Sequence, residues 1–524
     1  MNELLILLIL LLDMSIGIKH VLHMFQQNRY ELPRYTAWLK QRKYDKQDVV
    51  VLLITIIIFV IPVLINSKIL IMLYLLGFGL IKFIIEYRFE TNKQYIKPLK
   101  MTGRIKRQVL TLGCLNVIWI VLWLTLGMHY WTLAFLISLF INWLLVYPMY
   151  YINEPFENAV KNHFLKQAEH ILSEHNDLIK IGITGSYGKT STKNILNAIL
   201  SAEYYTLMTP ASYNTPMGIT ITIREMLKPL HEVFICELGA DKVGEIDFLM
   251  NFVKPRYGIV TSIGPQHLNT FKSMDNIISE KMAMIENLPT DGIGFVNMDN
   301  EYIANYHIMN KCRIITYGIK SVNVDYRVTQ IDYSPYGSSF VITDPDGSNH
   351  QFETKLLGEH NIMNILVSVA LARELKIDWD QLKVLVTQID HIEHRLELKK
   401  INGYTFIDNA FNSNPEGARM SLQVLSRMPN KRIIVTPGMI DLGERQEQEN
   451  KSFGKQMLGK VDLVILVGKE QTLSITEGLK EVGFDQSKIT VVDTVREAFD
   501  LVYKIADIND TILLENDLPD AFNK

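Results

Sequence analysis

The residues best suited to chemistry stand in a glycine-rich turn, Gly-Ile-Thr-Gly-Ser-Tyr-Gly-Lys-Thr-Ser, at positions 182–191. An apolar, strand-like run at 178–183 precedes the turn, and residues 189–201 are good helix formers. This order suits phosphate binding, because glycines let backbone N–H groups approach the oxygens. Lys189 can neutralise outer phosphates, and the Thr190 hydroxyl can bind Mg²⁺. The sequence therefore predicts a phosphate-binding loop.

One position separates this turn from the commonest phosphate-binding pattern. Position 183, where G-x-x-x-x-G-K-[ST] has its first glycine, is isoleucine. The form present at 184–191, T-G-x-x-G-K-T-[ST], resembles the ATP loop of the Mur ligases, which join an amino acid or a dipeptide to a growing cell-wall peptide. The alternative is a glycine-rich turn with an accidental lysine, and the flanking strand and helix argue against it.

Further motifs follow in the order of that family, and together they cover about residues 178–450. They are Glu237-Leu-Gly-Ala240, Gly244-Glu245-Ile246, His267-Leu268, Lys281, Asn297-Met-Asp299, the stretch 358–364, Arg395, the stretch 407–415 and the stretch 438–444. The first two are similar to the signature of the branch that adds D-alanyl-D-alanine to a muramoyl tripeptide. An ordered series is far more specific than any single motif.

The resemblance implies a role for each matched residue. The implied ATP-binding residues are Gly185, Ser186, Tyr187, Gly188, Lys189, Thr190, Ser191, Asn364, Arg395 and Asp408. Thr190 and Glu237 would hold one Mg²⁺, and His267 and Lys281 would serve a second. Lys281 would be carbamoylated as in the family, which replaces a repelling ammonium by oxygen donors. The implied catalytic residues are Lys189, His267 and Lys281.

The expected reaction follows from the chemistry of a carboxylate, which an amine does not attack productively at neutral pH. Transfer of the γ-phosphoryl group of ATP would give an acyl phosphate and ADP, and the amine would then expel phosphate. The enzyme would supply position and positive charge, from Lys189 and two Mg²⁺ ions, and no protein nucleophile. The expected partners are a carboxylate-bearing envelope precursor and an amino acid or dipeptide.

The chain before residue 153 is much more apolar than the rest. The mean hydropathy of the whole chain is +0.10 although 21% of its residues are charged. Residues 109–152 contain no charged side chain, and further apolar runs lie at 4–18, 49–65 and 69–85. One membrane crossing needs about 20 apolar residues. We therefore expect a bundle of about five transmembrane helices, and the core of a large soluble domain is the alternative.

Basic residues predict an orientation for this bundle. They are concentrated at 19–48 and 86–107, and the intervening turns carry Lys68 alone. By the positive-inside rule both loops are cytoplasmic. We therefore expect a multi-pass protein of the cell membrane with its N-terminus outside, its catalytic domains in the cytoplasm and membrane lipid as a partner.

The remaining chain alternates strand-like and helical runs. Strands are expected at 178–183, 233–237, 257–262, 294–297, 313–317, 404–407, 432–436, 463–467, 489–492 and 512–514. This alternation predicts parallel α/β sheets, with a small antiparallel excursion at 326–353. The expected domains are a transmembrane domain at 1–152, a linker helix at 153–177, a central ATP-binding domain with a P-loop at 178–392 and a Rossmann-like domain at 393–524.

Composition and departures from the family limit the substrate. A length of 524 residues suits about three domains, a net charge of −3 gives no reason to expect a nucleic-acid partner, and three scattered cysteines offer neither a disulfide framework nor a metal site. Asn409, Ala410 and Phe411 stand where the D-alanyl-D-alanine branch has Asp, Ser and Tyr, and 514–517 lacks that branch's lysine and glycine. The apolar segment also stands where relatives bind a UDP-sugar.

Three hypotheses therefore remain. The first is a membrane-anchored amide ligase acting on a cell-wall or envelope precursor such as a muramoyl peptide. The second is a ligase of the poly-γ-glutamate type, which would use another amino acid at the membrane. The third is an ATP-bound scaffold that docks envelope-synthesis proteins. The intact residues of two metal sites favour the enzymes over the scaffold.

Overall fold

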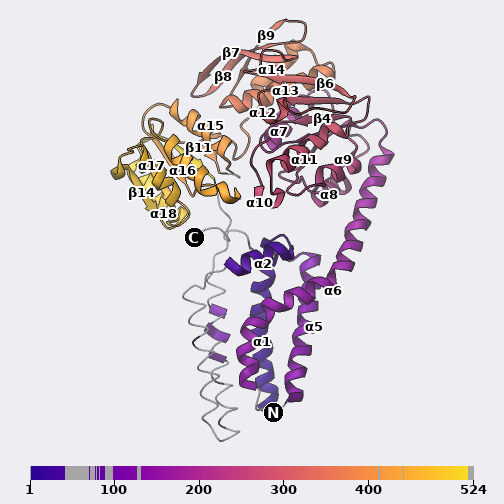
Figure 1. The fold of residues 1–524 in the computed structure, drawn as a ribbon, viewed down its shortest axis with the longest axis vertical. Coiled ribbons are helices and arrows are strands. Elements are labelled where there is room, and N and C mark those ends of the chain that lie inside the picture. The colour runs from indigo at the N-terminus through magenta and orange to yellow at the C-terminus, as the bar shows by residue number, and fades with distance from the viewer. Residues whose placement is uncertain are drawn as a thin grey trace. The chain divides into compact units, whose positions relative to one another are not determined.

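The computed structural model describes residues 2–41, 98–126, 131–410, 413–440 and 442–516, with scattered positions between 53 and 88. The chain divides into two compact units, Met1–His163 and Phe164–Leu518. Figure 1 shows helices in the first unit and two sheets flanked by helices in the second.

The described part of the first unit is helical. Its helices are α1 (Asn2–Gln27), α2 (Leu32–Gln41), α5 (Gly103–Leu126) and α6 (Trp131–Glu174), the last of which continues into the second unit. Buried apolar side chains such as Phe25, Leu112 and Val146 pack together between them. Asn116 Nδ2 donates to Asn142 Oδ1 at 2.9 Å across α5 and α6. Polar bridges of this kind fix how the helices pack.

The predicted bundle of about five transmembrane helices is wrong. Within the described ranges, one segment, Gly103–Leu122 of α5, is long and apolar enough to cross a membrane, judged by length and composition alone. The predicted spans at 49–65 and 69–85 lie largely outside the described residues. The multi-pass localisation with an external N-terminus depended on the bundle and is overturned with it. Apolar side chains of α1, α5 and α6 pack on one another, and 28% of the apolar window in Gly103–Leu122 is buried.

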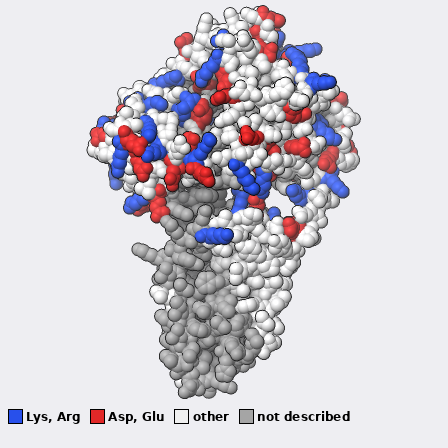
Figure 2. Space-filling view, in the orientation of Figure 1, with Lys and Arg blue, Asp and Glu red and all other residues white. Residues whose placement is uncertain are grey.

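The two units differ in surface character. Figure 2 shows acidic and basic side chains mixed over the surface of the second unit, whereas the described surface of the first unit is largely uncharged. Leu110, Ile118 and Val121 of α5 are among its exposed apolar side chains.

The larger sheet of the second unit has nine strands in the order β2-β3-β1-β4-β5-β6-β7-β8-β9. Its strands are β1 (Ile179–Thr184), β2 (Thr206–Met208), β3 (Val233–Glu237), β4 (Tyr257–Val260), β5 (Ile293–Asn297), β6 (Arg313–Gly318), β7 (Tyr326–Ser334), β8 (Gly337–Thr343) and β9 (Asn349–Thr354). Pairing is parallel from β2 to β7 and antiparallel from β7 to β9. The carboxyl ends of β1, β3 and β4 therefore meet at one edge, where ligands bind in such sheets.

Helices cover both faces of this sheet. They are α7 (Lys189–Leu200), α8 (Pro216–Met226), α9 (Glu245–Val253), α10 (Leu268–Phe271), α11 (Met274–Glu286), α12 (Glu301–Ala304), α13 (Glu359–Glu374) and α14 (Trp379–Gln388). Ile235 of β3 packs with α7 and α13, whereas its neighbours Phe234 and Cys236 pack with α8, α9 and α11. Successive side chains of a strand point to opposite faces, so the two helix layers lie on opposite sides.

The smaller sheet has six strands in the order β10-β11-β15-β12-β13-β14. Its elements are β10 (Glu397–Ile401), β11 (Tyr404–Asn409), α15 (Pro415–Ser426), β12 (Arg432–Thr436), α16 (Gln446–Gln456), β13 (Leu463–Val467), α17 (Leu473–Glu481), β14 (Ile489–Val492), α18 (Val495–Ile505) and β15 (Thr511–Glu515). Within this smaller sheet, β10 and β11 are the only described pair that is antiparallel. Helices α15, α16 and α17 pack on one face and α18 on the other.

The prediction of two α/β sheets is confirmed. Predicted strands at 233–237, 432–436, 463–467 and 489–492 have the observed limits, and the antiparallel excursion is β7 to β9. The short strands β2 and β10 were not predicted. The domain limits at 152, 177 and 392 stay predictions.

Candidate functional site

The glycine-rich turn connects β1 to α7 and holds the Lys189 side chain over its own backbone. Lys189 Nζ donates to the carbonyls of Gly185 at 2.6 Å and Ser186 at 3.2 Å. Burial lowers the pKa of Lys189 to about 8, against the attraction of Glu237. Gly185 and Gly188 have φ values of 146° and 85°, which favour glycine. The turn therefore concentrates positive charge where phosphates would lie.

A buried carboxylate lies beside this turn. Glu237, at the end of β3, accepts hydrogen bonds at Oε2 from Thr190 Oγ1 and Lys193 Nζ, both at 3.1 Å. Asn214 Nδ2 donates to Oε1 at 3.0 Å. Burial alone would raise the pKa of Glu237, but Lys193, Lys189 and these hydrogen bonds hold it below its ordinary value. The carboxylate is thus kept ionised next to the Thr190 hydroxyl, and both are hard oxygen donors.

Lys281, on α11, has its ammonium group buried near the same sheet edge. Its side chain is 2% exposed, and Nζ donates to the carbonyl of Ala240, three residues after Glu237, at 3.0 Å. Burial, together with the positive charge of Lys189, lowers the pKa of Lys281 to about 7. A large share of this amine is therefore neutral at physiological pH, as reaction with CO₂ requires.

His267 precedes the short helix α10 with a left-handed backbone, φ 54°. The ring of Phe271, the last residue of α10, has its centroid 5.6 Å from Lys281 Nζ. The structure thus brings the segment that begins at His267 up to Lys281.

Helix α13 presents buried polar atoms to the phosphate loop. Asn364 Oδ1 accepts from Thr192 Oγ1 at 3.1 Å, whereas Asn364 Nδ2 is buried with no hydrogen-bond partner. His360 Nδ1 is also buried with no partner, and burial and the charge of Arg395 lower the pKa of His360 to about 4. Orphaned buried groups of this kind fit a polar ligand, such as the base of a nucleotide.

Asp408, at the end of β11, already has two cationic or polar side-chain partners. Its Oδ2 accepts from His394 Nδ1 at 2.8 Å and from Lys399 Nζ at 2.7 Å. Lys399 Nζ also lies 2.9 Å from Glu397 Oε2. The ligand atoms of His394, Glu397 and Asp408 lie within 4.8 Å of one another. Because the Lys399 ammonium bridges both carboxylates, we assign no metal ion to this cluster.

Arg395 is partly buried, and the negative charges of two carboxylates act on it. Burial lowers its pKa, and the negative charges of Glu237 and Glu515 oppose that shift. The charge of the Arg395 guanidinium therefore interacts with Glu237 and with Glu515 of the smaller sheet.

Comparison with known families identifies this arrangement. The model of the Mur ligase middle domain matches residues 183–372, and that of the Mur ligase glutamate ligase domain matches residues 394–515. The chain belongs to the Mur ligase family. The resemblance drawn from the motifs is thereby confirmed, and this Mur ligase is an ATP-dependent, ADP-forming carboxylate–amine ligase, as its sequence predicts.

Relatives of this Mur ligase carry one recurrent name. The UDP-N-acetylmuramoyl-tripeptide--D-alanyl-D-alanine ligase of Bacillus subtilis (strain 168) is 27% identical over 339 residues, which is 64% of this chain and 72% of the relative. The ligase of the same name from Escherichia coli (strain K12) is 28% identical over 57% of this chain and 67% of its own length. A crystal structure of MurF from Acinetobacter baumannii superposes with a TM-score of 0.61 at 25% identity, covering 68% of this chain and 77% of that one.

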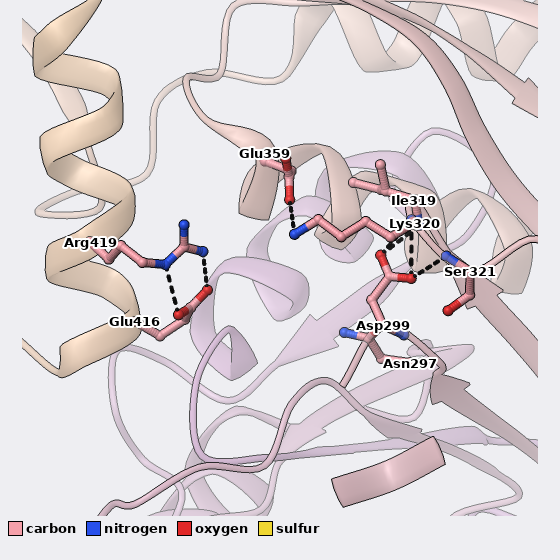
Figure 3. Close-up of polar contacts among 8 residues, drawn as sticks. All are labelled: Asn297, Asp299, Ile319, Lys320, Ser321, Glu359, Glu416 and Arg419. Atoms are coloured by element: carbon pink, nitrogen blue, oxygen red, sulfur yellow. Dashed lines mark hydrogen bonds and ion pairs between the residues drawn. The ribbon is translucent and has the colours of Figure 1, made fainter. Parts of the chain in front are cut away.

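Asp299, which follows β5, holds the turn after β6 in this Mur ligase. Figure 3 shows Asp299 accepting from the backbone N–H groups of Ile319 and Ser321, both at 2.7 Å, and of Lys320 at 2.9 Å. Burial alone would raise the pKa of Asp299, but these N–H groups hold it below its ordinary value. Lys320 Nζ lies 3.1 Å from Glu359 Oε1 at the start of α13. Asp299 thus stabilises the turn at 319–321, whose Lys320 contacts α13.

Sequence reasoning missed two residues of the site. Lys193 is 1% exposed and binds Glu237, and it also donates to the carbonyl of Ala211 at 2.5 Å. The signal was present, because Lys193 follows Lys189 by four residues on one helix face that is otherwise buried. Asn214, which donates to Glu237 Oε1, was not among the predicted site residues either.

Some predicted positions lie outside the described residues. They are Phe411, Asn412, Asp441 and Asp517. The predicted roles of the site residues stay predictions.

Proposed function

We propose that this Mur ligase joins an amine to the carboxylate of a muramoyl-peptide precursor of the cell wall, through an acyl phosphate. The contact of Thr190 Oγ1 with Glu237 Oε2 beside Lys189 supports this proposal most strongly. It places a hydroxyl, a carboxylate and an ammonium around a loop of phosphate-binding type. The names of the relatives supply the precursor and suggest D-alanyl-D-alanine as the amine.

Two divalent ions would complete this site. Thr190 and Glu237 would hold one Mg²⁺, and His267 with a carbamoylated Lys281 would serve the second. A neutral Lys281 amine, favoured by its pKa of about 7, can add CO₂ and gain two oxygen donors. Bound ions would neutralise charge that develops on the transferred phosphoryl group.

The nucleotide contacts follow from the same geometry. In the nucleotide complex, phosphate oxygens would replace the carbonyls of Gly185 and Ser186 as partners of Lys189 Nζ. The unpartnered Nδ2 of Asn364 would donate to an acceptor on the base. Arg395 and Asp408 would contact phosphate and ribose.

Two steps complete the reaction. The substrate carboxylate attacks the γ-phosphorus of ATP, the bond to the β–γ bridging oxygen breaks, and ADP leaves. The amine then attacks the acyl carbon, loses a proton, and phosphate leaves with the carboxylate oxygen that it received. The chain supplies orientation and positive charge.

Isotope transfer tests this proposal. The full-length protein is incubated with Mg-ATP, UDP-muramoyl tripeptide labelled with ¹⁸O in its terminal carboxylate, and either D-alanyl-D-alanine or glutamate. One labelled oxygen should appear in the released phosphate, with D-alanyl-D-alanine as the productive amine. Unlabelled phosphate would refute the acyl phosphate. Turnover with glutamate alone would refute the proposed amine and favour a ligase of the poly-γ-glutamate type.

A further inference from the structure

The side chains of Ser186 and Tyr187 point into the loop that follows β4. Ser186 is 2% exposed; its Oγ donates to the carbonyl of Gly264 at 3.0 Å and accepts from Gly264 N at 3.1 Å. The Ser186 N–H donates to the carbonyl of Ser262 at 2.6 Å. The polar groups of Ser186 are therefore engaged inside the protein.

Tyr187 makes the second contact between these loops. Its hydroxyl donates to the carbonyl of Pro265 at 3.3 Å. A Cβ added at Gly264 would lie 2.6 Å from the Tyr187 ring, so the ring packs directly on the backbone there. Only glycine at 264 allows this contact without a shift.

The β4 loop returns hydrogen bonds to the phosphate loop. Thr261 Oγ1 donates to the carbonyl of Tyr187 at 2.5 Å and lies 3.1 Å from the carbonyl of Thr184, the alternative acceptor of the same O–H. Ser262 Oγ also donates to the Tyr187 carbonyl, at 3.2 Å. Asn297, drawn in Figure 3, donates from Nδ2 to the Thr261 carbonyl at 2.8 Å. Hydrogen bonds thus run in both directions between residues 184–187 and 261–265, and we name this set of contacts the loop latch.

The loop latch ends two residues before His267. Helix α10 starts at Leu268, and Phe271 at its end is 1% exposed beneath Lys281. Packed and hydrogen-bonded groups therefore join the phosphate loop to the chain that leads into the segment that carries His267. Coupling of two sites requires such a shared element.

We infer that Ser186, Tyr187 and Thr261 are positioning residues that couple nucleotide binding to the ordering of residues 261–271. Ser186 and Tyr187 occupy positions of the ATP-loop motif, but their side chains serve the β4 loop. Nucleotide binding at 185–191 then stabilises the His267 segment. This inference rests on the proposed nucleotide site.

Hydrogen exchange measured by mass spectrometry tests the coupling. In the full-length protein, Mg-ADP should slow exchange both in 184–192 and in 261–271. Ser186→Ala removes both Oγ hydrogen bonds to Gly264, and Thr261→Val removes those of Oγ1. Each lost hydrogen bond is worth about fivefold in an equilibrium. The slowing in 261–271 should therefore fall at least about fivefold in each variant, and in Thr261→Val, whose changed residue lies outside the phosphate loop, 184–192 should stay protected.

Two controls separate coupling from general damage. Thr261→Ser keeps the hydroxyl and should retain the full effect. Ser201→Ala removes an exposed hydroxyl at the end of α7, which donates to the carbonyl of Ala198, and should leave both segments unchanged.

The possible outcomes separate the coupling from the proposed nucleotide site on which it rests. Wild-type slowing in 184–192 without slowing in 261–271 overturns the coupling alone. Unchanged slowing of 261–271 in Ser186→Ala and Thr261→Val overturns the assigned residues. If Mg-ADP slows exchange in neither segment of the wild type, the proposed nucleotide site is refuted as well.

Discussion

Glu237 shares one oxygen between a hydroxyl and an ammonium. Thr190 Oγ1 and Lys193 Nζ both bind Oε2. A divalent ion at Thr190 and Glu237 would compete with Lys193 for the same negative charge. Lys193 therefore stabilises the metal-free site at the expense of metal affinity.

Replacing Lys193 tests this competition. Lys193→Met leaves the buried Glu237 without its ion-pair partner, and such losses cost about 3–5 kcal/mol. The melting temperature should therefore fall, and Mn²⁺ should restore more of it in the variant than in the wild type. Thermal unfolding with and without Mn²⁺ measures both effects. Lys383→Met, which breaks an exposed pair with Asp380, should cost under about 1 kcal/mol. An equal Mn²⁺ shift in wild type and Lys193→Met would contradict the competition.

Lys281 gives a chemical test of the carbamate. Lys281→Ala should lose ligase activity, because the second ion loses its oxygen donors, and short carboxylic acids should restore part of it. Phosphate release from ATP measures the rescue. Lys242 lies two residues after Ala240, which Lys281 contacts, but it is exposed. Lys242→Ala is therefore the matched control. Full activity of Lys281→Ala without added acid would rule out the carbamate role.

Buried lysines also predict how stability changes with pH. The pKa values of Lys281 and Lys189 are lowered to about 7 and about 8 from an ordinary 10.5. Between these values and 10.5 the unfolded chain binds more protons than the folded one, so the free energy of unfolding rises with pH. Each group contributes at most about 1.4 kcal/mol per pH unit. Urea unfolding of the nucleotide-free protein at pH 7 and pH 9 checks the sign, and Lys281→Met should reduce the rise. A free energy of unfolding that falls over this interval would contradict the lowered pKa values of the two lysines.

At the scale of elements, apolar runs predicted the buried strands well. Strand β3, Val233–Glu237, is buried throughout, and its first four residues, Val-Phe-Ile-Cys, form an apolar run. Strand β2 has three residues, and β10, Glu-Leu-Lys-Lys-Ile, lies at a sheet edge with polar side chains. Neither contains an apolar run, so propensity could not find them. Edge strands depend on pairing with a neighbour that sequence pattern does not specify.

The phosphate loop depends on glycine at one position. A Cβ at Gly185 would lie 2.2 Å from Thr261 Oγ1, and its φ is 146°. Gly185→Ala should therefore push the loop from β4 and abolish ADP binding, measured by calorimetry. Gly347→Ala separates strain from collision, because φ there is 79° but no atom lies within 4 Å. That variant should lose about 1–2 kcal/mol of stability and keep ADP affinity. Equal ADP binding by Gly185→Ala and wild type would show that the collision is relieved without cost.

At the scale of the whole molecule, motif order was the reliable signal and hydropathy was not. Glu237, Lys281 and Asn364 are far apart in sequence, yet β3, α11 and α13 bring each toward the phosphate loop or its neighbouring strands. The order of motifs predicted this arrangement because that order is typical of one fold. The charge-free stretch 109–152 instead became parts of α5 and α6. Within this stretch Leu112 and Val146 pack between the helices, whereas Leu110, Ile118 and Val121 are exposed.

Helix α6 decides where the ligase can be separated from the first unit. It runs from Trp131 to Glu174, but Leu165, Ala168 and Leu172 pack into the core under β3, α8 and α9. A fragment that starts at residue 158 keeps these side chains and should fold and bind ADP with wild-type affinity. A fragment that starts at residue 176 loses three core side chains, each worth about 1–3 kcal/mol of burial, and should unfold at lower urea concentration. Urea unfolding and ADP calorimetry on both fragments measure this difference. Equal stability of the two fragments would show that the C-terminal part of α6 is no part of the ligase core.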